Sequence, residues 1–178
     1  MQIVVPEEFR YLYAQNDERP VVKIPAPVLR MKAAKVAKVS AKTQKLIDEL
    51  IRVMKQANGI GLAAPQLGVL QRVVVISPDG TRPIPLINPE VVAADGEQIG
   101  QEGCLSIPGL YGDVTRAMSI EVNALDRQGR EVTYRLQGMP ARVVLHEVDH
   151  LDGVLFIDKV DPATLHWSHP EGEEEPAE

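Results

Sequence analysis

The chain has 178 residues, of which 44% are hydrophobic, and a formal net charge of −6 at pH 7. This length and hydrophobic content suit one folded domain, and the acidic balance argues against general nucleic-acid binding, which normally selects a clustered basic face. No apolar run approaches the roughly 20 residues of a membrane helix, and residues 1–8 lack the basic-then-apolar order of a secretory signal, so we expect a cytoplasmic protein.

The first part of the chain predicts a short extension, a helix and then strands. Residues 1–20 mix charged and aromatic side chains, and we interpret them as an N-terminal extension that packs on the body as a short helix. Residues 43–57 place apolar side chains at helical spacing before Asn58-Gly59, which predicts a long helix. A hairpin turn is predicted at 126–129. Short apolar or β-branched runs predict strands at 73–76, 85–87, 91–93, 119–122 and 132–136.

A second helix is predicted from Pro140, which suits a first helical turn, to a stop at Gly153. Strands bracketed by an early and a late helix indicate an α+β fold, with short mixed or antiparallel sheets packed around the second helix. We expect one folded domain over residues 21–162 and an acidic, disordered tail over residues 163–178. Two histidines of this tail, His166 and His169, are interpreted as bystanders.

The motif His146-Glu147-Val148-Asp149-His150 carries the most direct chemistry in the chain. Two helical histidines four residues apart face the same way and can bind one divalent metal ion, while Glu147 is placed to handle protons. A structural zinc site is an alternative, but such sites are usually closed by four protein ligands, and this chain offers few more. The motif therefore predicts a hydrolytic metal centre with an open coordination position.

Three segments stand in the order and spacing of peptide deformylases, the family that this chain resembles. They are residues 59–66 (GIGLAAPQ), residues 102–106 (EGCLS) and residues 146–150 (HEVDH). The resemblance covers roughly residues 21–160. Each segment alone is weak to moderate evidence, whereas three collinear segments within one short chain are strong evidence.

The resemblance implies that Cys104, His146 and His150 bind the metal ion and leave a fourth position for water. A thiolate with two imidazoles suits Fe²⁺, Zn²⁺, Ni²⁺ or Co²⁺, and Fe²⁺ is the ion we expect. The single cysteine is then a ligand. As a nucleophile it would need a base to form its thiolate, and the helix histidines are better accounted for at the metal. An inert buried cysteine is the remaining alternative.

The family's reaction removes the formyl group from formyl-methionine at the N-terminus of newly made polypeptides and releases formate. Glu147 would take a proton from the attacking water and later protonate the departing amine. The resemblance assigns the side-chain amide of Gln66 and the backbone N–H of Leu105 to the oxygen that gains negative charge. Expected partners are N-formyl-Met peptides and nascent chains, with a transient ribosome contact left open. We expect a monomer without nucleic-acid or membrane function.

The resemblance also implies a pocket for the methionine side chain beside a glycine-containing loop that can run close to substrate. Leu145 stands where many relatives have glutamine, so pocket polarity and metal preference can differ. Glu102 and Arg116 are candidates for an ion pair that steadies the cysteine loop, with an ordinary exposed pair as the alternative. The candidate substrate-binding residues are Gly59, Ile60, Gly61, Leu62, Gly103, Tyr111, Val144 and Leu145.

Two alternative functions compete with this interpretation. A zinc endopeptidase shares the His-Glu-x-x-His motif, but it needs a third ligand, usually downstream, and little beyond an acidic tail follows His150. A deformylase-like binding module without catalysis is the other alternative. Loss of catalysis would be expected to release at least one site residue, and all five are intact: Gln66, Cys104, His146, Glu147 and His150.

Overall fold

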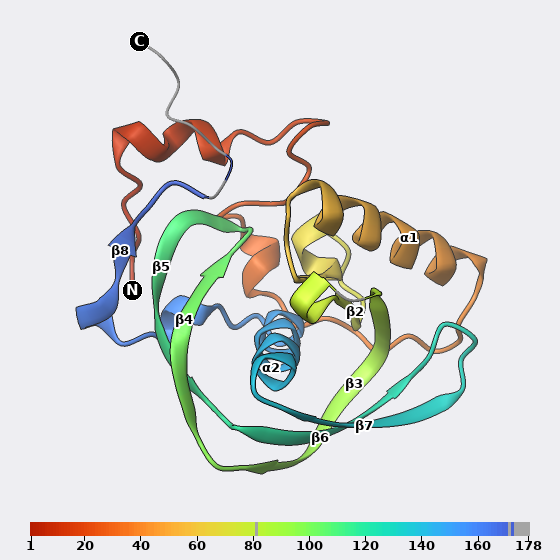
Figure 1. Ribbon diagram of the computed structural model, residues 1–178. Helices are drawn as coiled ribbons and strands as arrows, with labels where there is room; N and C mark the ends of the chain where they lie inside the picture. Colours follow the sequence, from red (N-terminus) through yellow and green to blue (C-terminus); the bar gives the residue numbers. More distant parts are fainter. Residues whose placement is uncertain (81, 171, 173–178) are drawn as a thin grey trace.

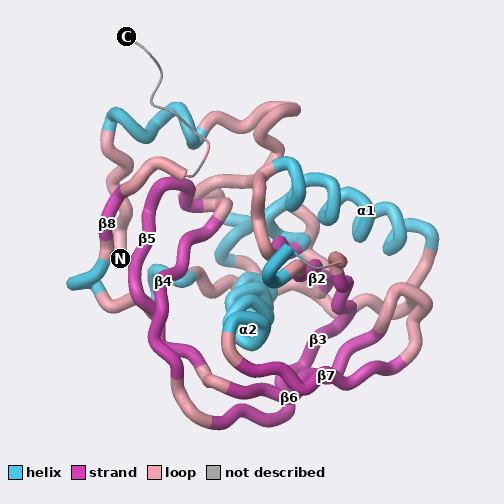
Figure 2. Tube along the Cα trace, viewed as in Figure 1, coloured by secondary structure: helices cyan, strands magenta, loops and turns pink. Residues whose placement is uncertain are grey.

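The structure is a computed structural model that describes residues 1–80, 82–170 and 172. Helix α2 (Met139–Leu151) lies near the centre of the fold, and strands curve around it (Figures 1 and 2). Helix α1 (Ala41–Gln56) packs to one side. The described residues form an α+β fold in which both sheets are antiparallel, so the predicted fold class is confirmed.

The larger sheet has five strands in the order β1-β2-β3-β6-β7, and one face of it covers α2. Its inward side chains and those of α2 form a core cluster that includes Val74, Leu86, Val122, Ala141 and Val144. Strands β6 and β7 are joined by the predicted hairpin turn. The strand bounds are β1 Gly61–Ala63, β2 Val73–Ile76, β3 Ile84–Asp95, β6 Ser119–Leu125 and β7 Glu131–Gln137.

The smaller sheet has the order β4-β5-β8, with bounds Gln98–Cys104, Ile107–Arg116 and His166–Trp167. The sequence did not predict these strands. Strands β4 and β5 carry four glycines and several polar side chains, so their apolar alternation is weak. The β4–β5 hairpin nevertheless matters most for function, because it holds Cys104 at its turn.

Helix α1 begins two residues before the predicted start and ends one residue before the predicted end. The backbone N–H of Ser40 donates to the hydroxyl of Thr43 at 3.1 Å, an N-terminal cap that sets the start at Ala41. Its buried side chains, Ile47, Leu50 and Met54, recur at helical spacing and pack on β1 and β2.

Two predicted strands, 85–87 and 91–93, are parts of the single strand β3. Asn88 interrupts the pairing with a φ of 52°. Its side-chain oxygen accepts from the N–H of Val36 at 2.8 Å and its amide donates to the carbonyl of Val36 at 2.9 Å. This local hydrogen bonding explains why the turn signal at Asn88-Pro89 bends the strand instead of ending it.

The 3-10 helix near the N-terminus and strand β8 both pack against β5 (Figure 1). The 3-10 helix η1 (Glu7–Tyr13) buries Phe9 and Leu12, in agreement with the predicted short N-terminal helix. The expectation of a disordered tail from residue 163 onward is corrected for its first part. Residues 163–170 include the end of η6 (Pro162–Thr164) and strand β8. Residues 171 and 173–178 lie outside the described residues. The remaining 3-10 helices are η2 Pro27–Arg30, η3 Ala64–Leu67, η4 Pro78–Gly80 and η5 Phe156–Asp158.

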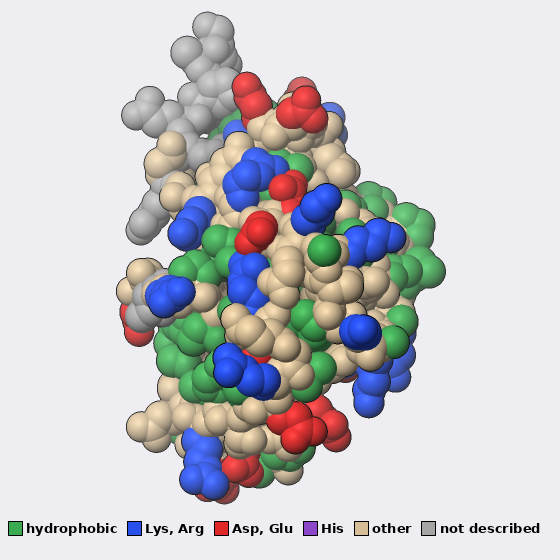
Figure 3. Space-filling view, turned by 90° about the vertical axis from the view of Figure 1, so that its right-hand side faces the viewer, with side chains coloured by type: hydrophobic (Ala, Val, Ile, Leu, Met, Phe, Trp, Pro, Cys, Tyr) green, Lys and Arg blue, Asp and Glu red, His purple; other side chains and the backbone are tan. Residues whose placement is uncertain are grey.

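On the face shown in Figure 3, Lys and Arg side chains are spread among acidic and hydrophobic ones and form no continuous basic surface among the described residues. Within the described part of the chain, we find no helix with both the length and the apolar character that crossing a membrane requires.

Candidate active site

Helix α2 carries two of the three predicted metal ligands, and the residues at its two ends fix its position. Gly138 adopts a φ of 67° before the helix, and Pro140 occupies its first turn. Gly153 ends it with a φ of 72°, and a Cβ there would lie 2.6 Å from the carbonyl oxygen of Arg30. The helix therefore has a fixed length and a fixed position against η2. His146 and His150 lie one turn apart on its inner face.

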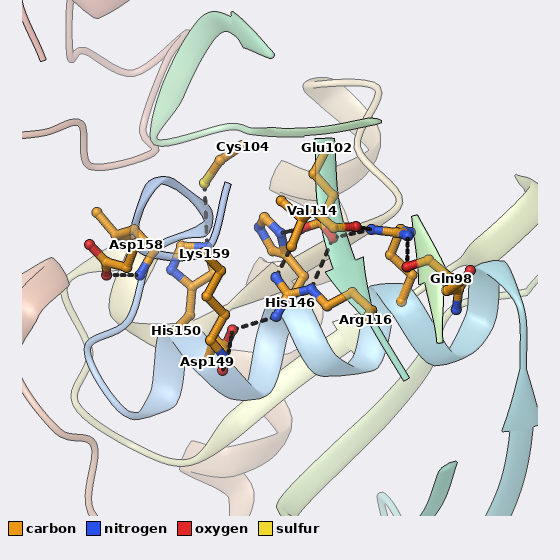
Figure 4. Close-up of polar contacts among 12 residues, drawn as sticks. Gln98, Glu102, Cys104, Val114, Arg116, His146, Asp149, His150, Asp158 and Lys159 are labelled. Carbon is orange, nitrogen blue, oxygen red and sulfur yellow. Dashed lines mark hydrogen bonds and ion pairs between the residues drawn. The ribbon is translucent and has the colours of Figure 1, made fainter. Parts of the chain in front are cut away.

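The third predicted ligand comes from the β4–β5 hairpin (Figure 4). One potential ligand atom each from Cys104, His146 and His150 lies within 4.8 Å of the other two. The sulfur of Cys104 lies 3.3 Å from Nε2 of His150. The three side chains that the sequence places far apart thus converge at one point, as the resemblance implies.

The donor set fits a transition-metal ion with soft and borderline ligands. Burial lowers the pKa of His150 well below its usual value, so its imidazole is neutral and can donate a lone pair. Burial opposes the charged form of His146, yet hydrogen bonds with Cys104 and Glu102 raise its pKa to about 10. A metal ion would therefore displace a proton from His146 when it binds.

Glu102 anchors a buried network of charges behind His146 (Figure 4). Its carboxylate accepts two hydrogen bonds from Arg116 at 2.9 Å each, one from Arg142 at 2.6 Å and one from Nδ1 of His146 at 2.8 Å. Arg116 also donates to Asp149 at 2.6 Å. Glu102, Arg116 and Arg142 are each at most 6% exposed. The ion pair of Glu102 and Arg116 is thus buried, so the alternative of an ordinary exposed pair is wrong.

The network keeps Glu102 ionised inside the protein. Burial alone would raise the pKa of its carboxyl, but hydrogen bonds from Arg116 and His146 outweigh burial and hold the pKa well below its usual range. A buried carboxylate that accepts from Nδ1 of a ligating histidine orients the ring and leaves Nε2 for the metal.

Glu147 is buried in a different environment, with no arginine bonded to it among the described residues. Burial raises the pKa of its carboxyl to about 7, and the positive charge of a bound metal ion would lower it again. Its Oε2 atom has no hydrogen-bond partner among the described residues. A carboxyl of this kind can accept and return a proton near neutral pH.

Gln66 is held in place from both ends of its amide. Its oxygen accepts from the N–H of Ala63 at 3.0 Å, and its nitrogen donates to the hydroxyl of Ser106 at 3.1 Å. The nitrogen also lies 3.8 Å from the sulfur of Cys104. The amide therefore presents its N–H side to the predicted metal position. Leu105 lies in the turn after Cys104 and lines the same cleft.

A cleft of about 710 Å³ opens over these groups. Most candidate substrate-binding residues line it, namely Gly59, Ile60, Gly61, Gly103 and Tyr111, together with Gln66, Cys104, Leu105, His146 and Glu147.

Three candidates for the substrate pocket, Leu62, Val144 and Leu145, do not line the cleft. Leu62 follows Gly61 in β1 and points the other way, into the core beneath α1. Val144 is buried in the core between α2 and the larger sheet, and Leu145 packs against the same core. The expectation for these three is corrected, because their side chains pack in the core, whereas the cleft is lined by the helix residues Met139, Arg142 and Val143.

Several cleft residues were missed by the sequence reasoning. Met139, Arg142 and Val143 line the cleft, and they precede His146 by seven, four and three residues, spacings that share a helix face. That spacing was a usable signal. His166 and His169, interpreted as bystanders, also line the cleft, and no local pattern indicated this.

Comparison with known proteins gives one consistent result. The family model for polypeptide deformylase matches residues 18–166. A peptide deformylase of Halothermothrix orenii is 50% identical over 139 residues, which are 78% of this chain and 90% of the relative. One of Thermomicrobium roseum is 47% identical over 161 residues, covering 85% and 91%.

Solved structures agree with these sequence matches. The crystal structure of a peptide deformylase from Legionella pneumophila superposes with a TM-score of 0.78 at 40% identity, covering 82% of this chain and 87% of that one. A peptide deformylase from Synechococcus elongatus in complex with actinonin gives a TM-score of 0.78 at 38% identity, covering 84% and 83%.

Proposed function

Because the chain belongs to the peptide deformylase family, it is a metallohydrolase with peptide deformylase activity, and we propose that its substrate is formyl-methionine at the N-terminus of newly made polypeptides. The products would be formate and a free α-amino group. The convergence of Cys104, His146 and His150 beside the buried carboxyl of Glu147 is the observation that carries this proposal.

Within this proposal, Cys104, His146 and His150 hold one divalent ion, with Fe²⁺ expected and Zn²⁺, Ni²⁺ or Co²⁺ as alternatives. The bound ion would supply Lewis acidity and lower the pKa of water near neutrality. Glu147 then accepts a proton from water and later delivers one to the amine nitrogen, because an amide nitrogen must leave as a neutral group.

The oxygen of the formyl group gains negative charge during attack and needs hydrogen-bond donors. The amide nitrogen of Gln66 is the donor that Ala63 and Ser106 hold in place. The backbone N–H of Leu105, in the turn beside Cys104, is the second proposed donor. Loss of one such donor costs roughly 100- to 1000-fold in rate. Met139 and Val143 replace Val144 and Leu145 as the proposed helix wall of the methionine pocket.

The decisive experiment compares wild-type protein with Glu147→Gln. Both are purified without oxygen, their metal content is quantified, and formate release from formyl-Met-Ala-Ser is measured. The variant should keep one metal ion per chain and lose most of its rate. Glu121→Gln on β6, which removes the ion-pair partner of the exposed Arg135 on β7, is the matched control and should leave the rate unchanged.

The same preparation separates the alternatives. Cleavage at internal peptide bonds without formate release would indicate an endopeptidase, and metal binding without any rate in the wild type would indicate a binding module. Either result overturns the proposal. To identify the metal, the protein is reconstituted with each of the four ions, and the rate of each sample is measured in air and without oxygen. Only the Fe²⁺ enzyme should lose activity quickly in air.

The substrate suggests where and with whom the enzyme works. We propose that it acts in the cytoplasm as a monomer, on nascent chains and free formyl peptides, with at most transient ribosome contact. Actinonin, which is present in the Synechococcus elongatus structure, is expected to compete with formyl peptides here.

A further inference from the structure

The segment His166–Pro170, here named the C-terminal strap, runs along the cleft. It is fixed to β5 by the pairing of Trp167 with Leu110, and by the N–H of Ser168, which donates to the carbonyl of Gly109 at 2.8 Å. Four of its five residues line the same cleft as Glu147: His166, Ser168, His169 and Pro170. The strap begins at the last residue that the family model matches.

Helix η1 fastens the strap from outside the cleft. The ring of Phe9 stacks on His169 with centroids 4.4 Å apart and lies 5.2 Å from the ring of Trp167. The hydroxyl of Tyr11 lies within hydrogen-bond distance of Nδ1 of His169, at 3.0 Å. Phe9 is only 5% exposed, and a Cβ on Gly109 would come within 2.8 Å of its ring. Two ends of the chain, both largely outside the family match, thus build one wall.

The position of the C-terminal strap relative to the predicted metal ligands indicates which part of a bound peptide it can contact. The formyl carbon must lie at Cys104, His146 and Glu147, so the peptide leaves along the rest of the cleft. A cleft of about 710 Å³ is larger than one formyl-methionine residue fills. The strap lines this same cleft without contributing a metal ligand, so it is available to the residues that follow methionine.

The chemistry of the strap favours contacts that tolerate different sequences. It offers two imidazoles, one hydroxyl and a proline to the cleft. The lining residues with a carboxylate or a guanidinium, Glu102, Arg142 and Glu147, are buried at the metal end. Stacking and hydrogen bonds to peptide backbone therefore dominate over charge selection, as suits an enzyme acting on many nascent chains.

We propose that the C-terminal strap, fastened by Phe9 and Tyr11, binds the peptide residues that follow formyl-methionine and gives this enzyme a preference for longer formyl peptides. The proposal rests on the proposed function above. His169 is its central residue, because it both lines the cleft and contacts η1.

The test compares a short substrate, formyl-Met-Ala, with a longer one, formyl-Met-Ala-Ser-Ala, in wild type and His169→Ala. The variant should raise KM for the longer peptide by roughly 3- to 10-fold, the loss expected for one stacking or hydrogen-bonding partner. Its kcat on both peptides and its KM for the short one should stay within about twofold. His169→Phe, which keeps a ring on Phe9 but loses the hydrogen bond with Tyr11, should give a KM for the longer peptide between those of wild type and His169→Ala.

Tyr11→Phe tests the fastening, because Tyr11 does not line the cleft. We expect it to raise KM for the longer peptide in the same direction as His169→Ala, whereas the control Tyr134→Phe on β7 should not. Equal changes for both peptides, or no change in any strap variant, would overturn the proposal. Inactivity of the wild type on both peptides would instead refute the proposed function. Thermal denaturation of each variant verifies that it is folded.

Discussion

Nδ1 of His146 lies 2.8 Å from Oε1 of Glu102, so a predicted metal ligand is tied to a buried carboxylate that also binds Arg116 and Arg142. The contact fixes which imidazole nitrogen faces Cys104. It also links the two secondary-structure elements that build the site, since Glu102 belongs to β4 and His146 to α2. The position of the ligands thus depends on the charge of a residue that is not itself one of the three predicted ligands.

Glu102→Gln tests this dependence. We expect metal affinity to fall about 10- to 100-fold, because the ligating imidazole loses its charged partner. The free energy of unfolding should also fall by about 3 kcal/mol, since Arg116 and Arg142 keep their buried positive charges without a full countercharge. Chelator competition measures the affinity, and urea denaturation measures the stability.

Glu121→Gln controls for the loss of one carboxylate on a strand. Its partner Arg135 has an 86% exposed side chain, so the change should cost less than about 1 kcal/mol and leave metal affinity intact. If Glu102→Gln binds the metal as tightly as Glu121→Gln does, the carboxylate does not orient His146.

We predict that the carboxyl of Glu147 can occupy its observed position only while residue 61 is glycine. A Cβ at Gly61 would lie 2.6 Å from Oε1 of Glu147, closer than real Cβ atoms approach any neighbour. Gly61→Ala should therefore push the carboxyl aside, lowering kcat at least about 10-fold while leaving metal content unchanged. Steady-state kinetics and metal analysis on the same sample measure this.

Gly59→Ala is the matched control in the same loop, because its Cβ would meet the tip of the Leu105 side chain, which can rotate away. We expect a small loss of rate there. A Gly61→Ala enzyme with wild-type kcat would show that Glu147 need not occupy its observed position.

The sequence predicted the reacting groups better than the walls around them. The spacing of His146 and His150 fixes their shared helix face, so this part of the site follows from local geometry. The same rule would have selected Met139 and Val143 in place of Val144 and Leu145, since they share a face with His146. The expectation placed the pocket on the side of α2 that faces the larger sheet.

The rest of the site depends on pairing between distant segments. The two-residue strand β8 pairs with Leu110 and Tyr111 of β5, and a strand so short has no periodicity to detect. Strand β4 places Glu102 inside the protein, which breaks the usual apolar alternation. Its burial makes sense only once Arg116 and Arg142 are known to lie beside it.

Metal removal should destabilise the fold in a way that separates ligands from other site residues. A metal at 100 times its dissociation constant adds about 2.7 kcal/mol of stability, which corresponds to roughly 5–10 °C in thermal midpoint for a chain of this size. Wild type and Glu147→Gln should show this shift between loaded and chelated samples. Cys104→Ser should lose most of it, and an undiminished shift would mean that the thiolate is not a ligand.

The ion pair of Arg30 and Asp158 should contribute stability that acid removes. Partial burial opposes ionisation of Asp158, but hydrogen bonds from Arg30 and from the N–H of Leu155 outweigh it and lower the pKa of the carboxyl. A folded-state pKa below the unfolded value means that the contribution is complete above the unfolded pKa and declines as pH falls through the folded one.

Asp158→Asn should therefore lower the free energy of unfolding by about 0.5–1 kcal/mol between pH 6 and 8, the upper range for a partly exposed pair. The difference from wild type should shrink below roughly pH 4. Urea denaturation with chelator present measures it without a metal contribution, and Asp48→Asn, which removes an exposed partner of Arg127, controls for one lost charge. A difference that stays constant down to pH 2 would show that the pair's charge is not the source of its stability.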